Sequence, residues 1–324
     1  MKKIILITLL ILVVATVGLA SYLTLFLPDV DPAPKLKVLA TTESIKHGEY
    51  LATNVAACMD CHSSRDWTRF SGPLKNGTLG MGGEYFGPEM GFPGKFYARN
   101  LTPTNLGDWT DGEIFRAITS GVNKDGKALF PVMPYPYYNR MDKNDVLDII
   151  AYLRSLSPIE NEIPTSEIQF PMNFIMNTFP KKPIFSNQPD RMDSIKYGEY
   201  LINTAACMDC HTQADKGQLI LDKAFAGGRE FILPNGIARS ANITPDKKTG
   251  IGSWPDSLFI NRFKAFSHPE NFKPITNEQV NTIMPWTMYA GMETHDLQAI
   301  FSYLKTIKPI QNEVIHFQHN GIKN

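Results

Sequence analysis

The pentapeptide Cys-Met-Asp-Cys-His occurs twice in this chain, at residues 58–62 and 207–211. The two copies contain all four cysteines of the 324-residue sequence, so no cysteine is left over for a disulfide. Longer matches surround both copies, with a nearly constant offset between them, which indicates a tandem duplication of one domain. The matching segments are 45–51 with 195–201, and 146–163 with 297–314.

A C-x-x-C-H run is the attachment signature of c-type haem. If the run is helical, the two cysteines share one face and can each form a thioether to the porphyrin, while the histidine becomes the proximal iron ligand. A redox dithiol or half of a zinc site is the alternative, but neither explains a histidine directly after both copies. We predict two covalently bound haem c groups, one held by Cys58, Cys61 and His62 and the other by Cys207, Cys210 and His211.

Each iron also needs an opposite axial ligand, and a methionine there would raise the reduction potential. Met133 and Met284 lie at matching places, far downstream of their histidines, and proline follows each of them. Proline keeps the backbone extended and removes a donor, which suits a loop that presents a thioether at a fixed angle. We predict His62 and Met133 on one iron, and His211 and Met284 on the other.

Other side chains compete for this axial position. Met141 and Met292 also match between the copies, but methionines pack in cores more often than they bind metals. A bis-histidine iron through His268 is a weaker alternative. We interpret the histidines outside the motifs as surface or capping residues: His47, His268, His295, His316 and His319.

The N-terminal stretch is apolar and carries no charge between Lys3 and Asp29. It is long enough to cross a bilayer as a helix. The alternative is a cleaved signal peptide, with Gly18 and Ala20 as the small residues before the cut. We favour a retained inner-membrane anchor because the apolar run continues past Ala20. Both alternatives leave the lysines inside, so the haem domains are expected on the periplasmic face.

The rest of the chain has the composition of a globular protein. Its formal net charge is zero and its hydrophobic fraction is 43%, which argues against a nucleic-acid partner. Apolar residues with helical spacing predict helices over 44–61 and 194–210, which lead into the motifs, and over 144–156 and 295–307. Segments 72–94 and 227–236 are rich in glycine and predict loops. The expected fold is all-α, with slight strand content.

Glycine in the middle of the opening helices costs about 1 kcal/mol relative to alanine. Gly48 and Gly198 therefore predict a close helix crossing, with Tyr152 and Tyr303 as neighbours. The proline-rich bridge after the first copy is too apolar for a free linker, and we expect it to pack along both domains. The predicted divisions are an anchor 1–28, a spacer 29–43, a first domain 44–163, an inter-domain segment 164–190, a second domain 191–315 and a tail 316–324.

Several motifs together resemble the cytochrome c subunits of membrane-bound alcohol and gluconate dehydrogenases, over most of residues 44–314. They are Ala-Arg-Asn-Leu-Thr-Pro at 98–103, Gly-Asp-Trp-Thr at 107–110, Phe-Arg-Ala at 115–117, Met-Pro-Tyr at 133–135, Tyr-Leu-Arg at 152–154, Phe-Pro-Met-Asn at 170–173, Asn-Ile-Thr-Pro-Asp at 242–246 and Thr-Gly-Ile-Gly-Ser-Trp at 249–254. The resemblance implies two tandem class I cytochrome c domains with His/Met iron. Those subunits carry a further haem, whereas this chain has two motifs.

The resemblance also implies a set of side chains near the haem propionates. Two carboxylates in a mostly apolar pocket need hydrogen-bond donors and a positive charge. The implied residues are Arg99, Asn100 and Trp109 in the first copy, and Arg239, Asn242 and Trp254 in the second.

The expected function is electron transfer without catalysis, because two six-coordinate irons leave no position for a substrate. Expected partners are a dehydrogenase or quinol-oxidising donor, and an oxidase or soluble cytochrome acceptor, at the membrane. Two alternatives stay open: a two-haem subunit of a terminal oxidase, and a di-haem peroxidase that keeps one iron open. The peroxidase predicts unequal sites, whereas the two copies here match at both axial positions.

Overall fold

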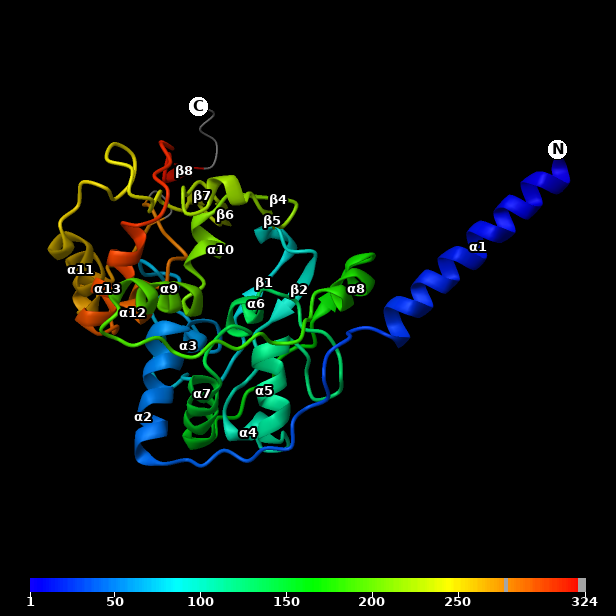
Figure 1. Ribbon diagram of the computed structural model, residues 1–324, viewed down its shortest axis with the longest axis horizontal. Coiled ribbons are helices and arrows are strands. Elements are labelled where there is room, and N and C mark those ends of the chain that lie inside the picture. Colours follow the sequence, from blue (N-terminus) through cyan, green and yellow to red (C-terminus); the bar gives the residue numbers. More distant parts are fainter. Residues whose placement is uncertain (277–278, 320–324) are drawn as a thin grey trace.

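The uncharged N-terminal stretch forms one long helix, α1 (Lys2–Leu25), that stands away from the rest of the molecule (Figure 1). The computed structural model describes residues 1–276 and 279–319. No residue of α1 is buried, and by length and composition the helix can cross a bilayer. The spacer that follows runs past the first half of the body, where the backbone N–H of Val38 donates to Asp111 Oδ2 at 2.8 Å.

The body consists of two halves with the same order of helices. A helix leads into each Cys-Met-Asp-Cys-His motif, the motif itself is a short helix, and a closing helix packs back against the opening one. In the first half these are α2 (Thr42–Tyr50), α3 (Cys58–Cys61) and α7 (Lys143–Ser155), with α4 (Pro103–Leu106), α5 (Asp111–Ser120) and α6 (Tyr135–Tyr138) between them. In the second half they are α9 (Ser194–Thr204), α10 (Cys207–His211) and α13 (Thr294–Leu304), with α11 (Asp256–Lys264) and α12 (Trp286–Tyr289) between them.

Helix α2 begins two residues before the predicted start at residue 44, and α9 begins at residue 194 as predicted. Thr41 caps α2, and its side chain and that of Ser44 form a reciprocal capping box. Asp193 caps α9 by accepting from the backbone N–H of Lys196. In each half the side chain that accepts the capping bond therefore lies just before the first helical turn.

A close helix crossing explains the glycine inside each opening helix. A Cβ on Gly48 would lie 1.8 Å from the backbone oxygen of Asp148, and one on Gly198 would lie 2.0 Å from that of Ala299. Any side chain at Gly48 would therefore push α2 and α7 apart, and any side chain at Gly198 would push α9 and α13 apart. The crossing agrees with the prediction, but the neighbours are backbone atoms of Asp148 and Ala299 rather than the rings of Tyr152 and Tyr303.

The expectation of an all-α fold is wrong. The chain is 42% helical and 9% strand, and the strands form three small sheets in the part that the structure describes. In the first half, β1 (Tyr85–Phe86), β2 (Gly94–Tyr97) and β3 (Glu167–Ile168) form an antiparallel sheet. In the second, β6 (Glu230–Leu233), β7 (Gly236–Arg239) and β8 (Phe317–His319) form another, and β4 (Ala214–Asp215) pairs with β5 (Gln218–Leu219).

Sequence periodicity missed these strands because all the described strands are only two to four residues long, too short to show a clear alternation. Glycine-rich loops bring them together: Gly94, at φ +153°, opens β2 where a Cβ would lie 2.3 Å from the Glu167 backbone oxygen. The third strand of each three-stranded sheet follows its closing helix. Strand β3 thus lies in the predicted inter-domain segment, and β8 lies in the predicted tail.

The two halves share one hydrophobic core, to which both opening and both closing helices contribute. The segment between the halves packs against the first of them. Its backbone N–H groups at Ile184 and Gln188 donate to the Asn139 carbonyl at 2.8 Å and to Asp142 Oδ2 at 2.9 Å. Arg191, the first residue of the predicted second domain, bonds Asp296 of its own half at 2.9 Å. Within this segment lies α8 (Met172–Ile175), which also contacts α1 (Figure 1).

Candidate haem-binding sites

Both motifs are preceded by the same break in the backbone. The predicted helix over 44–61 is not continuous: α2 passes into a π-helical turn at Leu51–Val55 and stops, and Ala57 adopts φ +50°. In the second half α9 ends at Thr204, and Ala206 also has φ +50°. A left-handed conformation is unfavourable for alanine. Its recurrence directly before both motifs marks these turns as built features, because such strain concentrates at functional sites.

The histidine of each motif is oriented by a backbone carbonyl. His62 Nδ1 lies 2.6 Å from the Arg99 backbone oxygen, and His211 Nδ1 lies 2.8 Å from that of Ala241. The carbonyl can only accept, so Nδ1 carries the proton and the unprotonated Nε2 can bind a metal. Metal-binding histidines are commonly oriented by such a bond. Burial lowers the pKa of both imidazoles, with the carbonyl bond opposing it, so both favour the neutral, ligating form.

The four thiols fit thioether attachment better than dithiol redox chemistry. Burial raises the pKa of the Cys58 and Cys207 thiols to about 12. A redox-active or nucleophilic cysteine would need its pKa lowered instead. Zinc also lacks a ligand set: across residues 1–276 and 279–319, no three His, Cys, Asp or Glu side chains are grouped to hold a metal ion. The donor set therefore fits the cofactor that the sequence motif predicts.

The Met-Pro loops lie against the backbone that leads into the motifs. Pro134 is the N-cap residue of α6, and the hydroxyl of Tyr138 at the end of that helix donates to the Ala56 carbonyl at 2.8 Å. In the second half Pro285 is the N-cap residue of α12, and the hydroxyl of Tyr289 donates to the Ala205 carbonyl at 2.9 Å. These two tyrosines were missed by sequence reasoning, although their matching positions in the repeat could have revealed them. Each ties a Met-Pro loop to the turn before a Cys-Met-Asp-Cys-His motif.

The four methionines that compete for the axial positions occupy two different environments. Met141 and Met292 are fully buried and belong to the hydrophobic core. Met133 and Met284 are only partly buried and pack at the margin of that core. The first pair has the surroundings of packing residues, whereas the second pair keeps part of its surface open.

The two asparagines of the expected propionate set, Asn100 and Asn242, hydrogen-bond protein groups. Asn100 is buried, its Nδ2 donates to the Ile159 carbonyl at 2.8 Å, and its Oδ1 accepts from both Thr102 N–H and Oγ1. Asn242 makes the same bonds, to the Ile310 carbonyl and from Thr244. Each asparagine lies next to the residue whose carbonyl orients the motif histidine. Its hydrogen bonds join this loop to the segment that follows the closing helix.

The two arginines of the expected set are not structural counterparts. Because Asn100 corresponds to Asn242, Arg99 corresponds to Ala241, and both supply the carbonyl to a motif histidine. The Arg99 side chain extends to the Pro164 carbonyl at 3.2 Å, whereas Arg239 Nη2 pairs with Glu230 at 2.7 Å. Trp109 and Trp254 both pack at the margin of the core.

The two motifs differ in how their internal aspartate is held. Asp60 is buried and pairs with buried Arg65 at 2.7 Å, and burial raises the Asp60 pKa to about 6 although Arg65 opposes the shift. Asp209 is more exposed and pairs with Arg229 at 3.2 Å. The two sites are therefore alike in their ligand residues but unlike in the charges around them.

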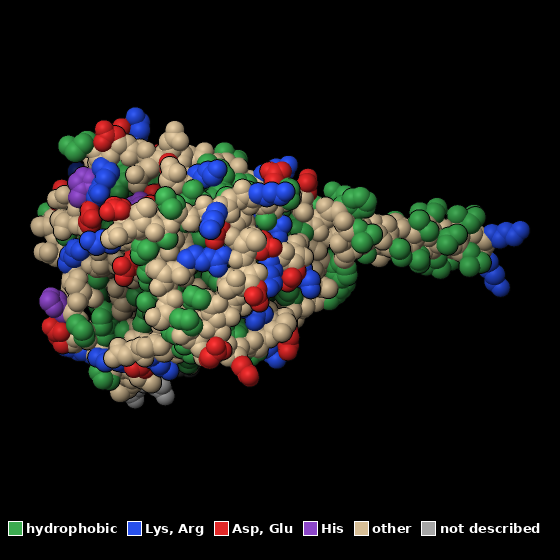
Figure 2. Space-filling model, turned by 90° about the horizontal axis from the view of Figure 1, so that it is seen from below, with side chains coloured by type: hydrophobic (Ala, Val, Ile, Leu, Met, Phe, Trp, Pro, Cys, Tyr) green, Lys and Arg blue, Asp and Glu red, His purple; other side chains and the backbone are tan. Residues whose placement is uncertain are grey.

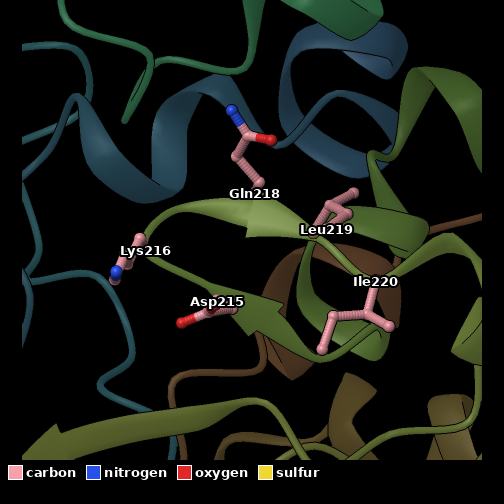
Figure 3. A pocket seen from close by; sticks show the side chains of 5 residues that line it. All are labelled: Asp215, Lys216, Gln218, Leu219 and Ile220. Carbon is pink, nitrogen blue, oxygen red and sulfur yellow. The ribbon is translucent and has the colours of Figure 1, made fainter.

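A cavity of about 340 Å³ adjoins the β4–β5 hairpin, which follows soon after His211 (Figure 3). Its lining offers no thiol, imidazole or thioether that could bind iron, so it adds no residue to the ligand sets. The lining residues are Asp215, Lys216, Gln218, Leu219 and Ile220.

No protein-family model matches the chain. It is 27% identical to the fructose dehydrogenase cytochrome subunit of Gluconobacter japonicus, over 90% of this chain and 59% of that protein. It is 27% identical to the cytochrome c subunit of a quinone alcohol dehydrogenase from Gluconacetobacter polyoxogenes, over 84% of this chain and 57% of that protein. It is also 27% identical to a di-haem c-type cytochrome of Cereibacter sphaeroides, over 59% of this chain and 64% of that protein.

The chain thus spans about three fifths of the length of these relatives, where 57–64% of each is matched. The predicted resemblance to dehydrogenase subunits is confirmed. The homologues of this chain are cytochrome c subunits of fructose, alcohol and gluconate dehydrogenases and a di-haem cytochrome c, at 24–27% identity over most of its length.

Proposed function

We propose that this chain is a di-haem cytochrome c that carries single electrons at the outer face of the inner membrane. Each haem, when bound, supplies one-electron redox chemistry at its iron. The protein contributes the thioether cysteines, the axial ligands and the spacing between the two sites. Cys58, Cys61 and His62 hold one group, and Cys207, Cys210 and His211 hold the other.

The paired orientation of the two motif histidines carries this proposal. A backbone carbonyl accepts from Nδ1 of His62 and of His211 at nearly the same distance. Both bonds leave Nε2 as the metal-binding atom. A motif that served only one haem would not need to preserve this arrangement in the second copy. The name of one homologue, a di-haem cytochrome c, agrees with a count of two.

Met133 and Met284 are proposed as the second axial ligands. Tyr138 and Tyr289 tie their loops to the turn before each motif, which supports a return of the chain toward the bound group. The partial burial of both methionines is compatible with a thioether that faces a cofactor. With both axial positions filled by the protein, neither iron would be open to a reactant, and the protein would act as a carrier rather than an enzyme.

The partners and the location follow from the relatives and from α1. Several relatives are named as cytochrome subunits of dehydrogenases, so we propose a dehydrogenase or a quinol-oxidising protein as donor. An oxidase or a soluble cytochrome is the proposed acceptor. Helix α1 would anchor the chain, with Lys2 and Lys3 inside and the body on the periplasmic side.

The direct test is to purify the full chain from membranes of a host with cytochrome c maturation, and to measure covalent haem by pyridine haemochrome and intact mass. We expect two haems in each chain, and one in Cys61→Ala and in Cys210→Ala. A wild-type content of one haem would contradict the proposal. The oxidised protein should also show the weak near-infrared sulfur-to-iron band, of which Met133→Ala and Met284→Ala each remove half.

The same preparations distinguish a carrier from a peroxidase. A carrier with both axial positions filled should have two low-spin irons, and its half-reduced form should not turn over hydrogen peroxide. A five-coordinate, high-spin iron in the wild type together with fast peroxide turnover would replace the proposal with the enzyme.

A further inference from the structure

The segment that joins the two halves contains a stretch with no charged side chain. Between Glu167 and Lys181 every residue is uncharged, and the stretch includes three phenylalanines. It forms α8 and a 3₁₀ turn at Met176–Thr178. A connecting segment normally lies on the surface in contact with water, so an uncharged and aromatic one needs an apolar partner.

This stretch contacts the end of the membrane helix. Asn177 Nδ2 donates to the Leu23 carbonyl at 2.9 Å, and both α8 and the 3₁₀ turn pack beside α1. The last carbonyls of a helix have no partner within the helix, and an unpaired carbonyl is costly in a membrane. Asn177 therefore supplies a hydrogen-bond donor to the last turn of α1, where the proposed anchor leaves the bilayer. The bond places α8 at the same level.

The stretch has a buried side and an open side. Met176 is buried, whereas Phe170 and Ile175 are 81% and 39% exposed. Phe170 stacks edge-on with Phe174, with 6.2 Å between the ring centroids. Figure 1 shows α8 beside the end of α1 that faces the body, and Figure 2 shows hydrophobic side chains continuing from the helix onto the adjoining shoulder of the body.

Lipid is the occupant that fits these observations best. The open side adjoins α1, which is itself proposed to be surrounded by lipid, and phenylalanine is common on the apolar face of segments that enter the boundary between headgroups and acyl chains. Lys181 follows the stretch directly and is exposed, and Lys182 beside it pairs with Asp31 at 2.8 Å. Basic side chains at this depth are attracted to anionic headgroups. The arrangement of an apolar surface flanked by lysines matches that of interfacial membrane segments.

We infer that residues 170–179 form a second membrane contact, in which Phe170, Phe174 and Ile175 enter the outer headgroup–acyl boundary beside α1. This inference rests on the membrane anchor of the proposed function. Because the contact belongs to the segment between the halves, it holds the haem-bearing body in one orientation. An anchor linked only through the extended spacer would let the body turn freely.

The test uses the full chain in nanodiscs of phosphatidylethanolamine and phosphatidylglycerol that contain a phospholipid with a photoreactive diazirine on its acyl chain. After illumination and proteolysis, mass spectrometry locates the cross-linked peptides. We expect labels in α1 and in the peptide that spans residues 155–181. Leu39 and Leu221 are also exposed but lie outside the inferred contact, and their peptides should remain unlabelled.

Labels confined to α1 would overturn the second contact and leave the anchor standing. Absence of labels in α1 as well would overturn the anchor, and with it this inference. Labels at Leu39 or Leu221 equal to those in 155–181 would show unspecific contact and would also overturn it. Haem content is measured on the same sample, so the electron-carrier proposal is judged separately.

A paired variant tests whether the contact orients the body. Phe170→Asn with Ile175→Asn should increase several-fold the rate at which trypsin cleaves the spacer at Lys35 and Lys37 in nanodiscs, because the body would then move away from the bilayer. Leu221→Asn is the matched control and should leave this rate unchanged. An equal rate in the paired variant and the control would contradict the inference, provided that circular dichroism and haem content show both to be folded.

Discussion

The hydroxyl of Tyr50 donates a 2.6 Å hydrogen bond to Asp296 Oδ2, across the boundary between the two halves. The reciprocal bond runs from Tyr200 to Asp145 Oδ2, and the tyrosines and aspartates occupy matching positions of the repeat. Each tyrosine oxygen also accepts from the backbone at the start of the other half's closing helix, at Glu293 and at Asp142. The duplicated halves therefore meet through an interface of the kind that two-fold dimers use.

These cross-half bonds should contribute measurably to stability. Tyr200→Phe would leave the Asp145 carboxylate without its shortest donor, a loss of about 1–3 kcal/mol for a buried group. Tyr50→Phe should cost less, because Arg191 still bonds Asp296. Denaturant unfolding of the haem-loaded chain measures both. Tyr303→Phe is the control, since its 3.5 Å contact with Glu199 is exposed; an equal cost at Tyr200 and Tyr303 would contradict the prediction.

Asp145 should make stability depend on pH. Burial raises its pKa, while the bonds from Tyr200 and the charge of His47 oppose the shift. The folded state therefore binds the proton more tightly than the unfolded state, whose aspartate pKa is about 3.9. Asp145 therefore contributes to the free energy of unfolding below the unfolded-state pKa, and this contribution is lost as the pH rises through the higher folded-state pKa.

Thermal unfolding between acidic and neutral pH checks this sign. As the pH rises, the unfolding midpoint of the wild type should fall relative to that of Asp145→Asn. Asp125→Asn, in an exposed turn, controls for the loss of a charge. A difference for Asp145→Asn that is constant over the range would show that the carboxyl titrates alike in both states.

The left-handed alanines before the motifs should be improved by glycine. Ala57→Gly and Ala206→Gly remove the Cβ that makes φ +50° unfavourable, so we expect each to add about 0.5–1 kcal/mol to the free energy of unfolding. Ala52→Gly, in the buried π-helical turn, should lower it instead by a similar amount. Calorimetry of the haem-loaded variants decides, and a loss of stability at both positions would mean that the alanine methyls contribute packing that outweighs the strain.

The two pairs of methionines should respond differently to truncation. Met141→Ala and Met292→Ala should cost about 2–5 kcal/mol of stability, because they open cavities in a filled core. They should leave the near-infrared sulfur-to-iron band unchanged. Met133→Ala and Met284→Ala should reduce that band with a smaller loss of stability. Loss of the band in Met292→Ala with its retention in Met284→Ala would reverse the assignment in the second half.

Much of the candidate site could be predicted from sequence because its signals are local. The five-residue motif places two thiols and an imidazole within little more than one helical turn, and its repetition pairs Met133 with Met284. The family motifs gave the resemblance to dehydrogenase cytochrome subunits, which the homologues confirm. The helical period of the opening and closing segments also predicted α2, α7, α9 and α13, apart from the break before each motif.

The remaining features depend on residues that are far apart in the chain. The carbonyl that orients His62 comes from Arg99, and the amide of Asn100 bonds the chain near Ile159. Neither hydrogen bond leaves a periodicity or a characteristic spacing in the sequence from which it could be predicted. The same is true of the third strands, β3 and β8, which pair with β2 and β7, strands that precede them by many residues.

By itself, the sequence determined the two Cys-Met-Asp-Cys-His motifs, the duplication and the long apolar N-terminal helix, because each depends on the order of neighbouring residues. Only the tertiary structure decided that small sheets accompany the helices and that a left-handed alanine precedes each motif. It also decided that Tyr50 and Tyr200 join the halves. Hydrogen bonds and close packing between distant segments set these features, and such contacts exist only once the chain has folded.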